Sequence, residues 1–271
     1  MREVEKGLPD RVGVTIGGRD IWNIRYADDT TLIAGSKESL SIAAEHLRVI
    51  SEEQGLLINN AKTNCMTIHG QGTIQIVDDN IENVEKLKFL GSYITPEGES
   101  KTEIAIRLAI AKSTTSDLTE IWKSKELSLK VKVKLAKALI WSVALYGCES
   151  WTLKKEEERM VDVFEMWLWR RVLRVSWKDR KTNSWVRNTI GVPAKEGLLE
   201  TIKKRKLSKY DHWKRRSDSL VLATIEGEVG AKGKKGRRRA EWIDDIRKWR
   251  GGMDIARRVA VMRSSHGSTE G

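Results

Sequence analysis

The spacing of apolar residues changes once along the chain, and this change divides the sequence into two kinds of structure. Before residue 95, short runs such as residues 12–16 alternate apolar with other residues, which predicts β-strands. From residue 101 onward, apolar residues recur at helical spacing, which predicts amphipathic helices over residues 104–121, 128–146 and 156–173. Val163 belongs to the apolar side of the third helix. The segment Thr95-Pro96-Glu97-Gly98 lies between the two patterns and contains turn residues. We therefore expect an α+β fold with a domain boundary near residue 98.

Charge is distributed unevenly between the two parts. Residues 1–99 carry 10 Lys and Arg against 16 Asp and Glu, a net charge of −6, whereas residues 100–271 carry 40 against 22, a net charge of +18. A positive field attracts phosphate backbones, with an affinity that falls steeply as salt rises. We therefore expect the second part to bind nucleic acid. The 11 Trp residues can stack on unpaired bases, but Trp at helical spacing more often packs in a core, where we expect most of them.

The two cysteines, Cys65 and Cys148, are far apart and have no metal-ligand pattern, which is typical of a reducing intracellular compartment. A zinc site at Cys65 and His69 would need two further ligands that the neighbouring sequence lacks, so we expect a buried thiol at Cys65. The sequence shows no N-terminal signal and no run of about eighteen apolar residues. We expect a soluble protein of the nucleus or cytoplasm, neither secreted nor in contact with a membrane. The sequence does not specify an oligomeric state.

Two adjacent carboxylates, Asp28 and Asp29, lie between two strand-like runs. Residues 21–26 and 30–34 are rich in apolar and β-branched residues, and Gly35 closes the second run. Asp-Asp between such runs predicts a tight hairpin turn. Side-by-side carboxylates repel each other unless a cation shares the site, and Mg²⁺ is the natural partner for oxygen ligands. The alternative is a solvated turn without a metal ion.

The run Ile24-Arg25-Tyr26-Ala27-Asp28-Asp29-Thr30-Thr31-Leu32-Ile33-Ala34 resembles the catalytic hairpin of reverse transcriptases, in particular those of LINE-type (non-LTR) retrotransposons. The resemblance implies an RNA-directed DNA polymerase that transfers nucleotides to a primer 3′-OH. It implies an RNA template and a DNA primer as partners, with Mg²⁺ as the cofactor and Mn²⁺ as the alternative. By the same resemblance, Asp28 and Asp29 are catalytic metal ligands, and Tyr26 and Ala27 contact the nucleotide or primer.

The segment after the hairpin extends this resemblance. We expect a helix that begins after the N-cap residue Ser36 and ends at Gly55, followed by strands over residues 56–59 and 64–68. In reverse transcriptases a lysine lies near the end of such a segment, and Lys62 matches it. The resemblance implies that Lys62 donates a proton to the leaving pyrophosphate or neutralises its charge. The alternative is a solvated loop lysine.

A further segment, Lys88-Phe89-Leu90-Gly91-Ser92-Tyr93-Ile94, resembles the hairpin that grips the primer 3′ end in these enzymes. Gly91 has no Cβ, so the primer backbone could approach it closely. The alternative is an ordinary strand pair, because Phe89, Leu90 and Ile94 suit a β-strand.

The family's metal clamp also needs a third aspartate from an earlier strand, with a nucleotide-binding region and fingers before the hairpin. Asp10 and Asp20 are within reach in sequence, but neither has that strand context. The 27 residues that precede Asp28 are too few to supply these parts. We therefore expect a truncated reverse transcriptase that is inactive alone. The alternative function is a non-catalytic basic nucleic-acid-binding protein.

The resemblance predicts four parts of the chain. Residues 1–98 would form a partial reverse-transcriptase palm of antiparallel strands with one helix, and residues 99–152 would form thumb-like helices. Residues 153–229 would form a post-thumb helical region, and residues 230–271 a basic loop, short helices and a disordered tail.

Basic residues of the second part gather in two segments, the helix predicted over residues 194–216 and the loop over residues 230–239. The loop cannot bury its like charges and is the strongest candidate for phosphate contacts, with nuclear localisation as its alternative use. The candidate nucleic-acid contacts are Lys203, Lys204, Arg205, Lys234, Lys235, Arg237, Arg238 and Arg239. The same helix side includes Lys206, Lys209, Lys214, Arg215 and Arg216, and weaker candidates are Lys125, Lys130, Lys132, Lys134 and Lys137. After the loop, we expect Asp244 and Asp245 on the solvated face of a short helix.

Overall fold

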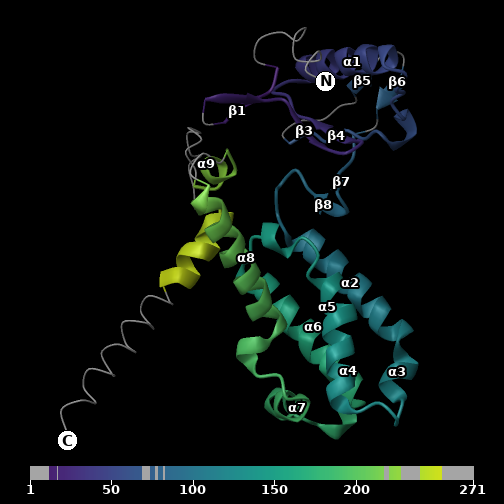
Figure 1. The fold of residues 1–271 in the computed structure, drawn as a ribbon, viewed down its shortest axis with the longest axis vertical. Helices are drawn as coiled ribbons and strands as arrows, with labels where there is room; N and C mark the ends of the chain where they lie inside the picture. Colours follow the sequence, from purple (N-terminus) through teal and green to yellow (C-terminus); the bar gives the residue numbers. More distant parts are fainter. Residues whose placement is uncertain are drawn as a thin grey trace, which may run out of the picture. The chain divides into compact units, whose positions relative to one another are not determined.

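The computed structural model describes residues 12–16, 18–68, 74–76, 79–81, 83–216, 220–226 and 239–251. These residues form two compact units. The first contains the described residues up to Glu99 together with α9 (Leu220–Glu226), and the second contains Ser100 to Arg216 together with residues 239–251. Strands lie in the first unit and helices in both, so the α+β class expected from the sequence is confirmed (Figure 1).

The described strands of the first unit form four antiparallel hairpins, and each strand pairs only with its hairpin partner. The hairpins are β1 (Val14–Ile16) with β2 (Arg19–Ile21), β3 (Asn23–Tyr26) with β4 (Asp29–Leu32), β5 (Ile74–Ile76) with β6 (Asp79–Ile81), and β7 (Leu87–Phe89) with β8 (Ser92–Ile94). Each strand is three or four residues long. The described part of the chain therefore shows strand pairs and no larger palm sheet.

Helix α1 (Lys37–Glu53) is the long helix of the first unit, and local sequence signals set both of its ends. Ser36 Oγ accepts a hydrogen bond from the Ser39 N–H at 3.1 Å, which caps the first turn. The helix ends at Gln54, and Gly55 follows with a φ of +74°, a conformation that glycine adopts without strain. The predicted cap at Ser36 and stop at Gly55 are confirmed.

The segment after α1 differs from the prediction. Residues 56–59 have no regular structure, and the 3₁₀ turn η2 (Asn60–Lys62) follows them. Leu57 is 84% exposed, so the apolar run finds no partner strand among the described residues. In the second predicted strand only Cys65 makes a bridge, to Asn83. The strands predicted over 56–59 and 64–68 are wrong, because strand propensity alone gives no ladder without a paired neighbour.

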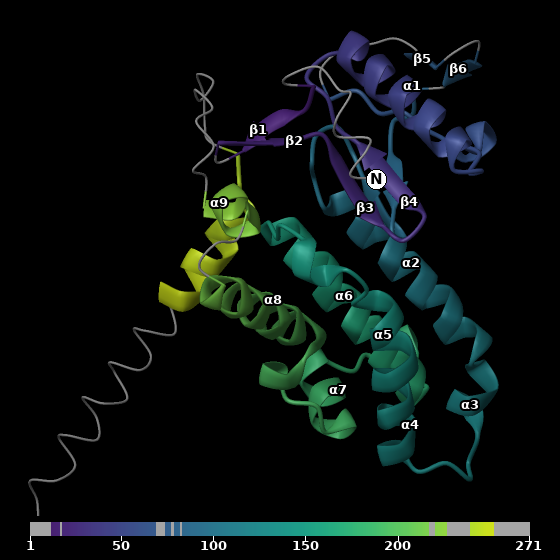
Figure 2. The ribbon, with the colours of Figure 1, turned by 45° about the horizontal axis from the view of Figure 1, so that its top comes forward.

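The second unit is a helical assembly built around α6 (Lys155–Leu173), which lies among its neighbours in both views (Figures 1 and 2). α6 contacts α2 (Lys101–Asp117), α3 (Thr119–Lys123), α4 (Leu129–Leu135), α7 (Asn183–Ile190) and α8 (Leu198–Arg215). Ile104, Leu168, Trp169, Val186 and Ile202 are fully buried and come from four of these helices. The core therefore runs along α6, and its helices follow the predicted pattern.

Two details of these helices could not be predicted from the apolar spacing. The helix expected from residue 128 to residue 146 contains a π-helical turn, η3 (Ala136–Ile140), before α5 (Trp141–Ala144). In α6 the expected stripe included Val163, which is 58% exposed, whereas Val161 is fully buried. The buried face is set by the helices that pack on α6. Within the described ranges, every helix is too short or too polar to span a bilayer.

Candidate catalytic hairpin and nucleic-acid interface

Asp28 and Asp29 lie at the tip of the β3–β4 hairpin. Tyr26 pairs with Asp29, so Ala27 and Asp28 are the two turn residues and Asp29 opens β4. Ala27 has a φ of +54°, as two-residue hairpin turns require to match the twist of their strands. Both carboxylates are exposed. The tight turn predicted at this position is confirmed, with two acidic groups presented to solvent.

The side chains on the two faces of β3 differ in their exposure to solvent. Ile24 and Tyr26 lie on one face, because side chains alternate along a strand, and they are 47% and 65% exposed. Arg25 lies on the other face, with its guanidinium 5.6 Å from the centre of the Trp22 ring. Its Nε and Nη2 atoms are buried and have no hydrogen-bond partner among the described residues. The side chain of Arg25 therefore provides a positive charge one residue before Tyr26.

The described carboxylates do not make up a two-metal clamp. Such a clamp holds ions about 4 Å apart with several oxygen ligands. No group of three or more His, Cys, Asp or Glu side chains in the described residues is placed to hold a metal ion. Asp20 lies in the separate β1–β2 hairpin, where its Oδ2 accepts from the Gly13 N–H at 3.3 Å, and Asp10 lies outside the described residues. Among the residues that the structure describes, Asp28 and Asp29 are therefore not joined by a third metal-ligating side chain.

The other two predicted active-site residues lie in their own local turns. Lys62 is exposed at the end of η2, where Asn59 Oδ1 accepts from the Lys62 N–H at 3.2 Å. Gly91 is the second turn residue of the β7–β8 hairpin, with a φ of +78°, and Leu90 before it has a φ of +46°. The turn itself accounts for the glycine, because it needs positive φ there. The proposed contacts of Lys62 and Gly91 with substrates stay predictions.

One face of α8 forms a shallow, open basic hollow of about 540 Å³. The hollow is lined by Lys204, Arg205, Ser208, Lys209, His212 and Arg215 of α8, with Glu149 at its edge. These positions recur every three to four residues and so share one helix face, which differs from the face that buries Ile202, Lys206 and Tyr210. Four cations meet one carboxylate here. We call this surface, defined by these seven residues, the α8 hollow.

The other basic residues of α8, Lys203, Lys206 and Lys214, do not line the hollow. Lys203 Nζ contacts Glu200 Oε1 at 2.5 Å, and its side chain is 23% exposed. Lys206 is fully buried. Among the predicted contacts on this helix, Lys204 and Arg205 line the hollow and Lys203 does not. Ser208 and His212 also line the hollow, and their spacing from Lys204 is the one sequence signal that could have identified them.

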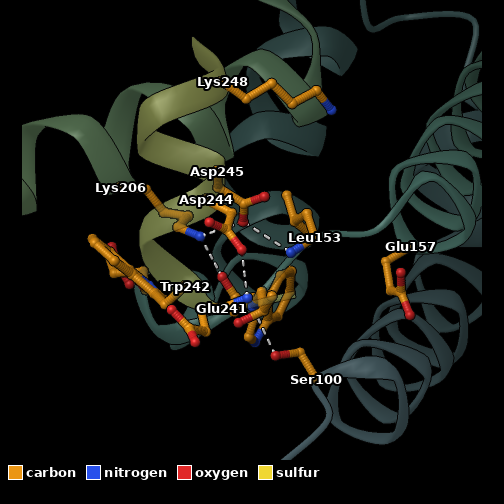
Figure 3. Close-up of polar contacts among 12 residues, drawn as sticks. Ser100, Leu153, Glu157, Lys206, Glu241, Trp242, Asp244, Asp245 and Lys248 are labelled. Carbon is orange, nitrogen blue, oxygen red and sulfur yellow. Dashed lines mark hydrogen bonds and ion pairs between the residues drawn. The ribbon is translucent and has the colours of Figure 1, made fainter. Parts of the chain in front are cut away.

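Lys206 forms a buried ion pair with Asp245, which comes from the helical residues 242–251. Lys206 Nζ donates to Asp245 Oδ2 at 2.6 Å and to the carbonyl oxygen of Trp151, and Asp245 Oδ2 accepts from the Leu153 N–H at 2.9 Å (Figure 3). The ring of Trp242 lies 4.6 Å from Lys206 Nζ. Burial lowers the pKa of Lys206, and the charge of Asp245 opposes that shift.

The predicted solvated position of Asp245 is therefore wrong, since this residue is 4% exposed. Its partner lies 39 residues away, which no local pattern reveals. Asp244 has a different role, because its Oδ2 accepts from the Glu241 N–H at 2.9 Å at the start of the helix. Asp245 therefore makes a buried ion pair with Lys206, whereas Asp244 makes a hydrogen bond within its own turn.

One of the weaker lysine candidates is also buried. Lys132 is 8% exposed and donates to the carbonyl oxygens of Trp122 and Ser124, at 2.8 and 2.7 Å. It closes the connection between α3 and α4, so the prediction of a phosphate contact at Lys132 is wrong. Lys137 is another of the weaker candidates, and its Nζ lies 5.1 Å from the centre of the Trp141 ring.

The basic loop falls almost wholly on residues that the structure does not describe. Lys234, Lys235, Arg237 and Arg238 lie outside the described residues, and so does His69. Arg239 is described and exposed.

Both cysteines are free and buried, as expected for Cys65. Burial is the main cause that raises the pKa of Cys148 to about 12, and the nearby charge of Glu149 raises it further. The neutral thiol is the stable form of this residue at neutral pH.

The fold and its surfaces define an α+β protein with a basic helical unit. The chain is similar to a Caenorhabditis elegans protein whose name describes it as transposon-derived. The two are 26% identical over 249 residues, which is 86% of this chain and 86% of the relative. No family model matches the chain, and no solved structure matches it. The similarity is consistent with a transposable-element origin.

Proposed function

We propose that the chain derives from the reverse transcriptase of a LINE-type retrotransposon. The observation that carries this proposal is the turn at Tyr26 to Asp29, where two exposed carboxylates lie at the tip of a two-residue hairpin. The surrounding sequence resembles the polymerase hairpin, and the relative with a transposon-derived name supports the same origin.

We also propose that the chain does not polymerise DNA by itself. The loss of a single electrostatic stabiliser in an active site typically lowers the rate by ~10²–10³. The described residues supply only two adjacent carboxylates of the required donor set. A missing metal ligand should cost more than a single stabiliser, so the rate should fall below detection.

Primer extension on an RNA template with Mg²⁺ or Mn²⁺ tests this proposal. We expect the chain to incorporate no more nucleotide than the matched variant Asp28→Asn/Asp29→Asn, which removes both charges and keeps the side-chain size. Robust incorporation that Asp28→Ala abolishes would overturn the proposed inactivity and support the catalytic role of the pair. Robust incorporation that survives Asp28→Ala would overturn both proposals.

A second candidate function is nucleic-acid binding, which the α8 hollow favours. Lys204, Arg205, Lys209 and Arg215 place four positive charges along one helix face, with Glu149 as the one acid at the hollow. Arg205 Nη1 lies 3.9 Å from Glu149 Oε1, which leaves the pair loosely associated. Phosphate oxygens are the natural ligands for such a row of cations. Binding through this surface needs no catalytic metal.

Electrophoretic retention of RNA tests the second function. We expect Lys204→Gln/Lys209→Gln/Arg215→Gln to weaken retention strongly, and Asp28→Asn/Asp29→Asn to leave it unchanged. The matched control is Lys112→Gln/Lys155→Gln/Arg159→Gln, which removes the same charge, from two lysines and one arginine, at exposed positions of α2 and α6 outside the α8 hollow. Equal weakening by both triple variants would show that net charge, and not the α8 hollow, holds the RNA.

A further inference from the structure

The connection between α6 and α7 exposes a tryptophan almost completely. Trp177 opens the 3₁₀ turn η5 (Trp177–Asp179) and is 84% exposed. Trp185, at the start of α7, is 38% exposed. Trp122, Trp141 and Trp169, in contrast, are buried in the core of this unit. The exposed indole of Trp177 is a large apolar surface that the fold leaves in water.

Local hydrogen bonds hold this connection in shape. Asp179 Oδ2 accepts from the Ser176 N–H at 2.6 Å, and Ser176 Oγ accepts from the Lys178 N–H at 3.4 Å. Arg170 reaches over from α6, where its Nη2 donates to Asn183 Oδ1 at 2.8 Å and to the Lys181 carbonyl at 3.2 Å. The turn that carries Trp177 is therefore tied at both ends, which reduces the ordering cost of binding.

The surroundings of Trp177 are strongly basic. Residues 170–181 contain six cations and one acid. The cations are Arg170, Arg171, Arg174, Lys178, Arg180 and Lys181. The one acid is Asp179, whose carboxylate already accepts a backbone hydrogen bond. The positive charge of this turn is thus largely uncompensated within its own segment.

We propose that Trp177 stacks on an unpaired base of single-stranded RNA or DNA while the cations around it contact the flanking phosphates. Stacking on aromatic side chains combined with a basic track is the usual way to hold single strands without sequence preference. A duplex keeps its bases stacked on each other and offers no free base face to Trp177. The inference rests on the proposed nucleic-acid binding and adds a preference for single strands.

Charge complementarity favours nucleic acid over an apolar protein surface as the occupant. A protein that covered Trp177 would also have to accommodate the six neighbouring cations, and uncompensated charge at an interface is costly. A phosphate backbone supplies the opposite charge at regular intervals beside each base. Lys178 Nζ lies 5.9 Å from the centre of the Trp177 ring, and Lys181 Nζ lies 4.9 Å from the centre of the Trp185 ring. A cation for the phosphate and a ring for the base are therefore close together.

The test compares three ligands of equal length: a single-stranded oligonucleotide that contains 2-aminopurine, the same backbone with abasic sites, and a duplex. We expect Trp177→Ala to weaken binding of the single strand about tenfold and to abolish the quenching of 2-aminopurine fluorescence. Trp177→Phe should keep most of the affinity, because it retains a ring that can stack. Binding of the abasic strand and the duplex should not change. The control is Leu57→Ala, which shortens another side chain that is 84% exposed.

The outcomes separate the two proposals. If Trp177→Ala leaves the single-strand affinity unchanged, or weakens the abasic strand equally, stacking at Trp177 is overturned. The α8 triple variant should weaken all three ligands, because it acts on phosphates. If that variant has no effect, the proposed binding through the α8 hollow is overturned, whatever Trp177→Ala does.

Discussion

Lys206 and Asp245 join α8 to the helical residues 242–251 through an ion pair in which Nζ and Oδ2 are 2.6 Å apart and both residues are buried. The pair also satisfies backbone groups, since Lys206 donates to the Trp151 carbonyl and Asp245 accepts from the Leu153 N–H. Three segments that are distant in sequence therefore meet at one pair of charges. This contact fixes the buried side of α8, and the α8 hollow lies on its other side.

Removal of either partner should destabilise the protein strongly, because the remaining charge stays buried without a counterion. We expect Lys206→Met or Asp245→Leu to lower the free energy of unfolding by about 3–5 kcal/mol. The double variant should recover part of that loss. Denaturant unfolding measures these values.

The control is Lys248→Met, which breaks the more exposed pair with Glu158. That change should cost under about 1 kcal/mol. A loss of similar size in the Lys206 and Lys248 variants would contradict the structural role assigned to the buried pair.

Ala27 in the turn before Asp28 carries backbone strain, because its φ is +54°. A left-handed conformation costs an L-residue with a Cβ roughly 1–2 kcal/mol, and glycine is free of that cost. We expect Ala27→Gly to change the free energy of unfolding of the first unit by less than about 1 kcal/mol, since the gain is offset by a more flexible unfolded chain. Ala27→Val should destabilise it clearly more. Thermal unfolding compares the variants, and equal effects of Gly and Val would contradict the strained turn.

The thiol of Cys148 should be unreactive in the folded protein. Its pKa is raised to about 12 from the ordinary value of 9.0, mainly by burial, so almost none of it is thiolate at pH 8. We expect a thiol-specific reagent to label Cys148 only as fast as the protein unfolds, and to label it at once in denaturant. Because the folded pKa is the higher one, this thiol stabilises the fold below pH 9 and loses that contribution as the pH rises toward 12. Rapid labelling of the native protein at pH 8 would contradict the burial.

Mg²⁺ should bind the β3–β4 hairpin weakly, because in the part of the chain that the structure describes no third acidic or metal-ligating side chain joins Asp28 and Asp29. A ligand stabilises a protein appreciably only when its concentration reaches or exceeds its dissociation constant. We expect millimolar Mg²⁺ to shift the melting temperature of the parent chain no more than it shifts that of Asp28→Asn/Asp29→Asn. A clear rise in the parent chain that is absent in the variant would show that further ligands complete the site.

Features that depend on neighbours in sequence could be predicted. The Asp28 turn, the Ser36 cap and the Gly55 stop each follow from a few adjacent residues, and the structure has all three. Contacts between distant segments could not be predicted. The sequence therefore indicates a solvated position for Asp245, whereas in the structure this residue is buried and pairs with Lys206. The strands expected around Lys62 failed for a related reason, since strand formation depends on a partner.

The same distinction applies to the candidate surfaces. The basic character of α8 is plain in its sequence, but which cations reach solvent depends on the helix face that packs. Lys204 lies in the α8 hollow, whereas Lys203 pairs with Glu200. The exposure of Trp177 likewise depends on tertiary packing, because its helical neighbours Trp167 and Trp169 have similar sequence surroundings and lie half-buried or buried.

The salt dependence of RNA affinity measures whether the α8 hollow binds a phosphate backbone. Fluorescence anisotropy with a single-stranded RNA gives the slope of log K against log salt for the parent chain and for Lys204→Gln/Lys209→Gln/Arg215→Gln. Each lost phosphate contact on a single strand reduces the slope by roughly 0.7. We predict a slope that is smaller by about 2 in the triple variant, while the control Lys112→Gln/Lys155→Gln/Arg159→Gln keeps the parent slope. An unchanged slope in the α8 variant would contradict the account.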